Sequence, residues 1–154
     1  MNRRRGSTLL EFALLAPVLA ALLAGFFSVS LTFVRTLQAD EICRKAAEMA
    51  AGGADFNQTP VKAQIFDLYG GKALEERRGV LYVTHIVRDA NGYHGTQSYE
   101  LGKLGRWRST AETSPDRIVE LEPGEDAWFA ELWLDNGSVL ASVTPSELHA
   151  RCVR

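Results

Sequence analysis

The chain has 154 residues, with 17 Lys and Arg, 19 Asp and Glu, and a formal net charge of −2 at pH 7. This length fits one small domain, and the absence of a dense basic stretch argues against a nucleic-acid-binding protein. Residues 72–108 are net basic and residues 112–147 strongly acidic. This asymmetry indicates either two differently solvated faces of one domain or complementary patches on neighbouring subunits.

A long uncharged run follows the N-terminus. Arg3, Arg4 and Arg5 come first, Glu11 is the one carboxylate before the run, and residues 12–34 carry no charged side chain. As a helix, this run spans about 34 Å at ~1.5 Å per residue, enough to cross a hydrocarbon core of roughly 30 Å. We therefore predict a transmembrane helix at about 12–34. The arginines predict a cytoplasmic N-terminus, with the rest of the chain on the other side.

Two targeting signals compete with this interpretation. Ser28-Val29-Ser30 has the small residues of a secretory cleavage site, but the apolar run is too long for a signal peptide, and Glu11 fits poorly at its start. Arg3-Arg4 could belong to a twin-arginine signal, although the surrounding motif is poor. A single permanent anchor is the favoured prediction.

The helical pattern continues beyond the apolar run. Residues 36–51 keep a helical period, and Gly52-Gly53 is typical of a helix stop. We expect Pro17 to kink or loosen this helix, because proline removes a backbone donor. One face of the upper part is apolar, with Ala39, Ile42, Cys43, Ala46 and Ala50.

The apolar run also carries small residues at spacings of three or four: Ala13, Ala16, Ala20, Ala24 and Ser28. Such a stripe lets membrane helices approach closely. An alanine-rich anchor with no packing role explains it equally well.

The remainder predicts a small α+β domain with a short helix and an antiparallel sheet of three to four strands, packed on the upper half of the long helix. Thr59-Pro60 is a typical helix start, with Thr59 as the cap and Pro60 in the first turn, and Gly70-Gly71 is the expected stop. Strands are expected at residues 80–87, 93–101 and 127–134, and turns at Asp89-Ala90-Asn91-Gly92 and Pro123-Gly124. Residues 103–116 read as a loop gathered by Trp107, and Asp135-Asn136-Gly137 as a hairpin turn into a strand at 138–143.

No residue pattern indicates catalysis. His85, His94 and His149 lack metal-ligand spacing, so no metal and no cofactor is predicted, and the protein is not expected to be an enzyme. Glu131 is an acid within an apolar strand. Alternation along the strand favours an outward side chain, and the alternative is a buried pair with a base such as Arg35 or Arg44.

The chain has two cysteines, Cys43 and Cys152. If the domain lies outside the cytoplasm, the compartment is oxidising, and an internal disulfide would tie a C-terminal tail that is expected to be loose to the long helix. Because the disulfide would close a long loop, its stabilisation of the folded state has an upper limit of roughly 4–5 kcal/mol. Free thiols, or a bond to another subunit, remain open alternatives.

Arg-Arg-Arg-Gly followed by Ser-Thr-Leu-Leu-Glu-Phe and a long apolar run resembles type IV prepilins, and most of all the TadE-like minor pilins (pseudopilins) of tight-adherence (Tad) systems. The resemblance is strong over residues 3–51 and weaker beyond. Residues 121–131 are similar to a turn and strand near the C-terminus of TadE-like domains.

The resemblance implies cleavage between Gly6 and Ser7 by a prepilin peptidase, which would place Glu11 at the fifth position of the mature chain. It thereby divides the chain into a leader (1–6), a long helix (7–51) and a periplasmic α+β domain (54–154). The implied location is the bacterial inner membrane, with possible incorporation into an adhesive extracellular pilus. The implied partners are membrane lipid, the peptidase, other pilins and pseudopilins, and the pilus assembly platform.

Two other functions fit the residues. One is a single-pass anchored envelope module that binds a protein or surface ligand outside any fibre. The other is a secreted enzyme behind a removable signal.

Overall fold

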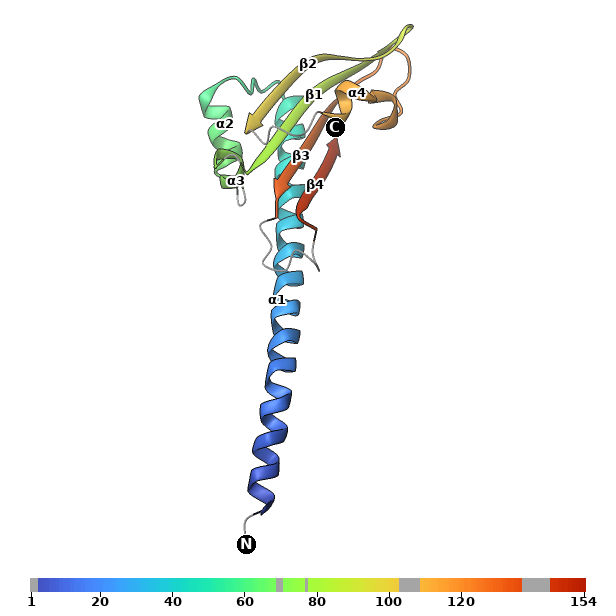
Figure 1. Cartoon of the computed structure of the whole chain (residues 1–154). Helices are drawn as coiled ribbons and strands as arrows, with labels where there is room; N and C mark the ends of the chain where they lie inside the picture. Colours follow the sequence, from blue (N-terminus) through green and yellow to red (C-terminus); the bar gives the residue numbers. More distant parts are fainter. Residues whose placement is uncertain (1–2, 69–70, 77, 103–108, 137–144) are drawn as a thin grey trace.

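The structure is a computed structural model that describes residues 3–68, 71–76, 78–102, 109–136 and 145–154; side chains are described from Glu11 onward, except that of Glu112. A single helix, α1 (Arg3–Ala51), runs the length of the molecule, and an α+β head packs beside its C-terminal half (Figure 1). The predicted fold class is confirmed. The helix begins four residues earlier than Ser7 and continues through Pro17.

The end of α1 is set by glycine. Gly53 adopts a positive φ of 82°, which a residue with a side chain rarely adopts. The amide of Gly53 donates to the carbonyl of Ala50 at 2.9 Å, and that of Ala54 to Met49 at 2.9 Å. These two bonds form a Schellman motif, so the predicted stop at Gly52-Gly53 is confirmed.

Two short helices follow, α2 (Thr59–Phe66) and α3 (Lys72–Glu75). The N-cap of α2 is Gln58, with Thr59-Pro60 as its first two helical residues, so the predicted cap is wrong by one position. Ile65 is fully buried, and Val61 and Leu68 pack against the same core. The predicted stop at Gly70 lies outside the described residues, and α3 was not predicted.

A four-stranded antiparallel sheet forms the head, with the order β2-β1-β3-β4. The strands are β1 (Gly79–Asp89), β2 (Gly92–Gly102), β3 (Asp126–Asp135) and β4 (Glu147–Val153). The first three match the predicted strands. The predicted return strand at 138–143 lies outside the described residues, and β4 corrects the expectation of a loose C-terminal tail.

Both faces of the sheet are covered. One face packs on the upper half of α1, where Ile42, Cys43 and Ala46 are fully buried against Ala130 and Leu132 of β3. On the opposite face, the short helices α4 (Thr110–Thr113) and η1 (Pro115–Arg117) lie over β1–β3. The sequence had predicted a loop in this part of the chain. Residues 103–108, including Trp107, lie outside the described part. A second cluster fills this face: Ile86, Ala111, Leu121, Ala127 and Phe129.

Candidate functional site

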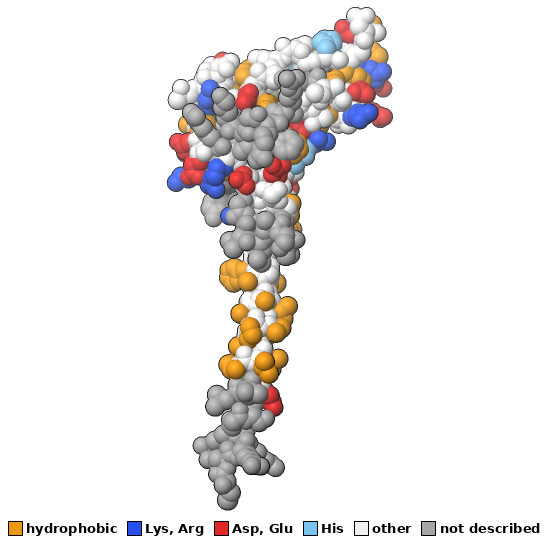
Figure 2. Space-filling model, viewed as in Figure 1, with side chains coloured by type: hydrophobic (Ala, Val, Ile, Leu, Met, Phe, Trp, Pro, Cys, Tyr) orange, Lys and Arg blue, Asp and Glu red, His pale blue; other side chains and the backbone are white. Residues whose placement is uncertain are grey.

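The lower half of α1 is apolar and exposed. Its large side chains are uncovered, with Phe26 71%, Phe12 68% and Leu22 66% exposed. Figure 2 shows this segment as a stalk of hydrophobic side chains below the head. By length and composition α1 could cross a membrane, and its most apolar stretch has no residue buried against the rest of the chain. A soluble monomer rarely exposes so large an apolar surface, so this half of α1 is suited to contact with lipid or with other apolar helices.

The small-residue stripe lies in this same exposed half. Ala13, Ala20 and Ala24 are exposed, and Ala16 and Ser28 are partly exposed. None of the four alanines belongs to the described hydrophobic clusters of the head, so this part of the stripe is available to another helix. Gly25 beside it is equally open, because a Cβ there would meet nothing within 4 Å.

The residues predicted for cleavage and subunit pairing lie at the N-terminal end of the stalk. Gly6 and Ser7 lie within the first turns of α1, and Glu11 is an exposed side chain where the apolar segment begins. The structure therefore separates these residues from the head by the whole apolar half of the helix.

Asn136 fastens the head to α1 just above the apolar segment. Its buried side chain accepts a hydrogen bond from Arg35 Nη1 at 3.2 Å and donates to Thr32 Oγ1 at 3.3 Å. Arg35 is the first charged residue after the apolar run. It therefore bonds to the head at the level where a membrane surface would lie.

Glu131 is the site that the sequence reasoning placed wrongly. Its side chain is fully buried instead of facing solvent, and neither Arg35 nor Arg44 is its partner. The carboxylate accepts hydrogen bonds from Thr110 N at 2.7 Å and Thr110 Oγ1 at 2.6 Å. Alternation failed because α4 covers the face of the sheet that was expected to be solvated.

Two β4 side chains complete this cluster. His149 Nε2 lies 2.8 Å from Glu131 Oε1, and Arg151 Nε lies 3.2 Å from the same oxygen. The His149 ring also stacks on Trp133, with centroids 3.7 Å apart. Glu131 thereby joins α4, β3 and β4 through one carboxylate.

The electrostatics of the cluster favour an ionised acid beside a neutral imidazole. Burial by itself would raise the pKa of Glu131, but hydrogen bonds from Thr110 and His149 outweigh it and hold that pKa below its ordinary value. Burial lowers the pKa of His149 more than its hydrogen bond to Glu131 raises it, and the charge of Arg151 lowers it further. The arrangement holds the head together and supplies no nucleophile.

The two cysteines lie between α1 and β4. Cys43 is fully buried, and its thiol donates to the carbonyl of Ala130 at 3.1 Å. Cys152 is partly buried, and its thiol lies 3.9 Å from the carbonyl of Asp40. Both are free thiols in the structure.

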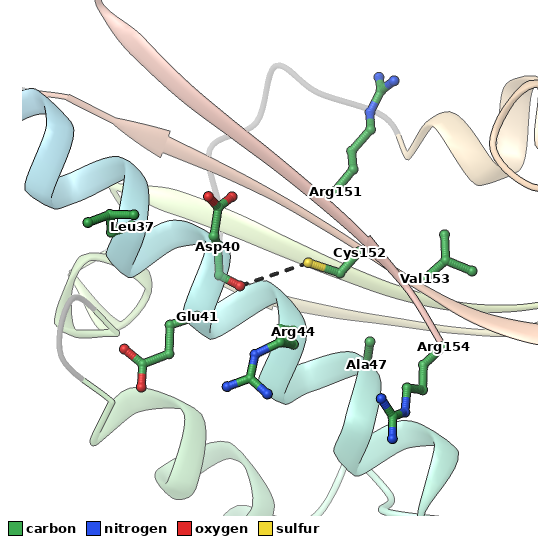
Figure 3. A pocket seen from close by; sticks show the side chains of 9 residues that line it. All are labelled: Leu37, Asp40, Glu41, Arg44, Ala47, Arg151, Cys152, Val153 and Arg154. Atoms are coloured by element: carbon green, nitrogen blue, oxygen red, sulfur yellow. Dashed lines mark hydrogen bonds between the residues drawn. The ribbon is translucent and has the colours of Figure 1, made fainter.

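Cys152 opens onto a groove of about 680 Å³ between α1 and β4 (Figure 3). Charged side chains of both signs border this groove, including Asp40 and Arg44 from α1 and Arg151 from β4. Within the described ranges, no group of three or more His, Cys, Asp or Glu side chains could hold a metal ion.

These features define the class: an α+β protein whose N-terminal helix is half apolar stalk and half core of the head. Comparison with known families gives a match to the family model described as TadE-like protein. The match covers residues 6–51, which is nearly all of α1. The resemblance inferred from the leader and helix start is confirmed over this segment. No curated protein and no solved structure gives a significant match.

Proposed function

We propose that the chain is a minor pilin, or pseudopilin, of a Tad-type IV pilus system, anchored in the bacterial inner membrane by residues 12–34. The observation that carries this proposal is the division of α1. Its lower half is apolar and uncovered, its upper half is buried in the head, and the TadE-like match includes both. The proposed role is structural.

The arginines support an orientation. Arg3, Arg4 and Arg5 precede the apolar segment, and such residues remain cytoplasmic beside a first membrane helix. The head then lies in the periplasm. Arg35 and Asn136 bond to each other at the upper end of the apolar segment. They would therefore lie at the periplasmic surface of the inner membrane.

Processing by a prepilin peptidase between Gly6 and Ser7 is part of the proposal. The first turn of α1 contains three arginines and no acid, an unfavourable arrangement at the positive end of a helix dipole. Gly6 further weakens this turn, because glycine lowers helix stability by up to about 1 kcal/mol relative to alanine. Helix ends open most readily, so the peptide bond is accessible to a protease without unfolding the rest of α1.

Cleavage would give Ser7 a positively charged amine near neutral pH. A carboxylate in an apolar environment is best tolerated when it is paired. We infer that Glu11 of an incoming subunit pairs with the Ser7 amine of a neighbour, which sets the axial register. The subunit's own amine lies only about 6 Å along the helix at ~1.5 Å per residue, so pairing within one chain competes.

Substitution of Glu11 tests the assembly role. Glu11→Ala should insert in the membrane and be cut, yet fail to crosslink to partner pilins or to enter the fibre. Glu11→Asp should rescue incorporation only partly, since its side chain is one methylene shorter. Glu41→Ala removes an exposed glutamate from the upper half of the same helix and serves as the control.

Counting pili and quantifying crosslinks in the three variants separates the alternatives. If Glu11 pairs only within its own chain or merely marks the headgroup boundary, Glu11→Ala gives wild-type pili and crosslinks. A single-pass anchored module outside any fibre predicts no crosslinks to pilins even in the wild type. Either result contradicts the proposal.

A further inference from the structure

The two cysteines are brought together from distant parts of the chain by the packing of β4 on α1. Cys152 pairs with Ala130 in the register of β3 and β4, and the thiol of Cys43 donates to the carbonyl of that same Ala130. The Cys152 side chain points from β4 toward α1, where it approaches the carbonyl of Asp40 (Figure 3). Each thiol therefore lies in the seam between helix and strand.

The surroundings of the two thiols differ. Cys43 is fully buried, whereas Cys152 is partly exposed at the groove. Cys43 cannot reach a cysteine of another subunit without opening the head. Each thiol shifts the pKa of the other, so the two lie close together. This geometry favours an internal pair over a bond between subunits.

We propose that Cys43 and Cys152 are a disulfide-forming pair, oxidised by thiol–disulfide exchange after the head reaches the periplasm, which fastens the edge strand β4 to α1. This inference depends on the proposed function for the oxidising compartment, and on the contacts above for the choice of partner.

The exposure of Cys152 sets the order of the chemistry. Its thiolate attacks one sulfur of an oxidised dithiol, such as a thiol–disulfide oxidoreductase, and a mixed disulfide forms as the oxidant's other sulfur leaves. Cys43 then loses its proton and attacks Cys152 Sγ, which releases the oxidant as a dithiol. Two S–H bonds are lost, one S–S bond forms, and the two electrons reduce the oxidant.

The second step is expected to be slow in the closed head. Burial raises the pKa of Cys43, and the nearby Cys152 thiol raises it further, so little thiolate is present. β4 is an edge strand with β3 on one side only, so local opening of β4 can admit the base that removes the proton.

The resulting bond would give the head a covalent closure. It would join the middle of α1 to the last described strand and enclose the whole sheet in one loop. A force that pulls on the head would then be transmitted to α1 through the disulfide as well as through the packing of the sheet on the helix.

The test uses the full chain in two preparations. Protein isolated from membranes under alkylating, non-reducing conditions should have no free thiol and should give a Cys43–Cys152 linked peptide. Reduced, purified full chain in detergent, incubated with oxidised glutathione, should form the same linked peptide with the loss of two hydrogen masses. Cys152→Ser should leave Cys43 unreactive to maleimide in the native protein and reactive after denaturation.

The outcomes distinguish this inference from the proposed function. Formation only of a glutathione adduct or of a dimer through Cys152 in the purified chain overturns the internal pair. If the linked peptide forms with glutathione yet the membrane-isolated protein has two free thiols, the periplasmic placement fails and oxidation in the cell is refuted.

Discussion

Loss of the Glu131 carboxylate should destabilise the head more than loss of any exposed acid. Glu131 is fully buried, and it accepts hydrogen bonds from Thr110 and Arg151 and shares one with His149. In Glu131→Ala, the Thr110 amide loses its hydrogen-bond acceptor, and the Arg151 guanidinium loses its counter-ion.

The magnitude follows from these contacts. Removing one partner of a buried, hydrogen-bonded charge pair costs about 3–5 kcal/mol. The cost for Glu131→Ala should lie at the lower end of this range, because the Arg151 side chain is 48% exposed and can be solvated once the carboxylate is gone. Glu131→Gln keeps the shape and one acceptor oxygen, and should cost about 1–2 kcal/mol, the difference between charged and neutral hydrogen bonds.

Unfolding of the full chain in detergent micelles, followed by near-ultraviolet circular dichroism, measures this effect. Trp133 stacks on His149 beside Glu131 and reports on the cluster directly. Glu100→Ala, at an exposed strand position, is the matched control and should stay within about 0.5 kcal/mol of the wild type. Equal stabilities of Glu131→Ala and Glu100→Ala would refute the reasoning.

Acid should weaken the head, because both Glu131 and His149 bind fewer protons when folded than when unfolded. Stability is full above the ordinary pKa of histidine, ~6.5, and falls below it, first through His149 and then through Glu131 below about 4.3; unfolding curves from pH 8 to 4 measure this, and a flat profile contradicts it. Asn136→Ala should destabilise the head by about 1–3 kcal/mol, since it leaves buried polar groups without partners; an unchanged unfolding midpoint would reject that role. The double substitution Ala20→Leu and Ala24→Leu should block incorporation into pili and leave membrane insertion intact, because the wider side chains keep neighbouring helices apart. Normal piliation would show that the stripe does not pack against other pilin helices.

Local signals in the sequence were sufficient for much of the fold. The extent of α1, the hairpin of β1 and β2, and the strand β3 follow from hydrophobic period, β-branched residues and glycine turns. Gly53 shows why: the positive φ that ends α1 is a property of one residue and needs no tertiary information.

The rest depended on packing between distant segments. The near-continuous apolar run at 127–134 is typical of a strand buried on both faces, and this signal could have placed Glu131 inside. Residues 147–153 alternate polar and apolar side chains, which could have predicted β4, but their residue types favour strands weakly. No sequence pattern identifies Thr110, His149 and Arg151 as partners of one acid.

The central claim is that the N-terminal helix is a processed pilin stalk, and the mass of the mature membrane protein tests it most directly. Intact mass and sequencing of the N-terminal peptide should show loss of Met1–Gly6 and a chain that begins at Ser7, with or without a methyl group. A full-length chain, or one shortened by roughly thirty residues as for a secretory signal, would contradict the account.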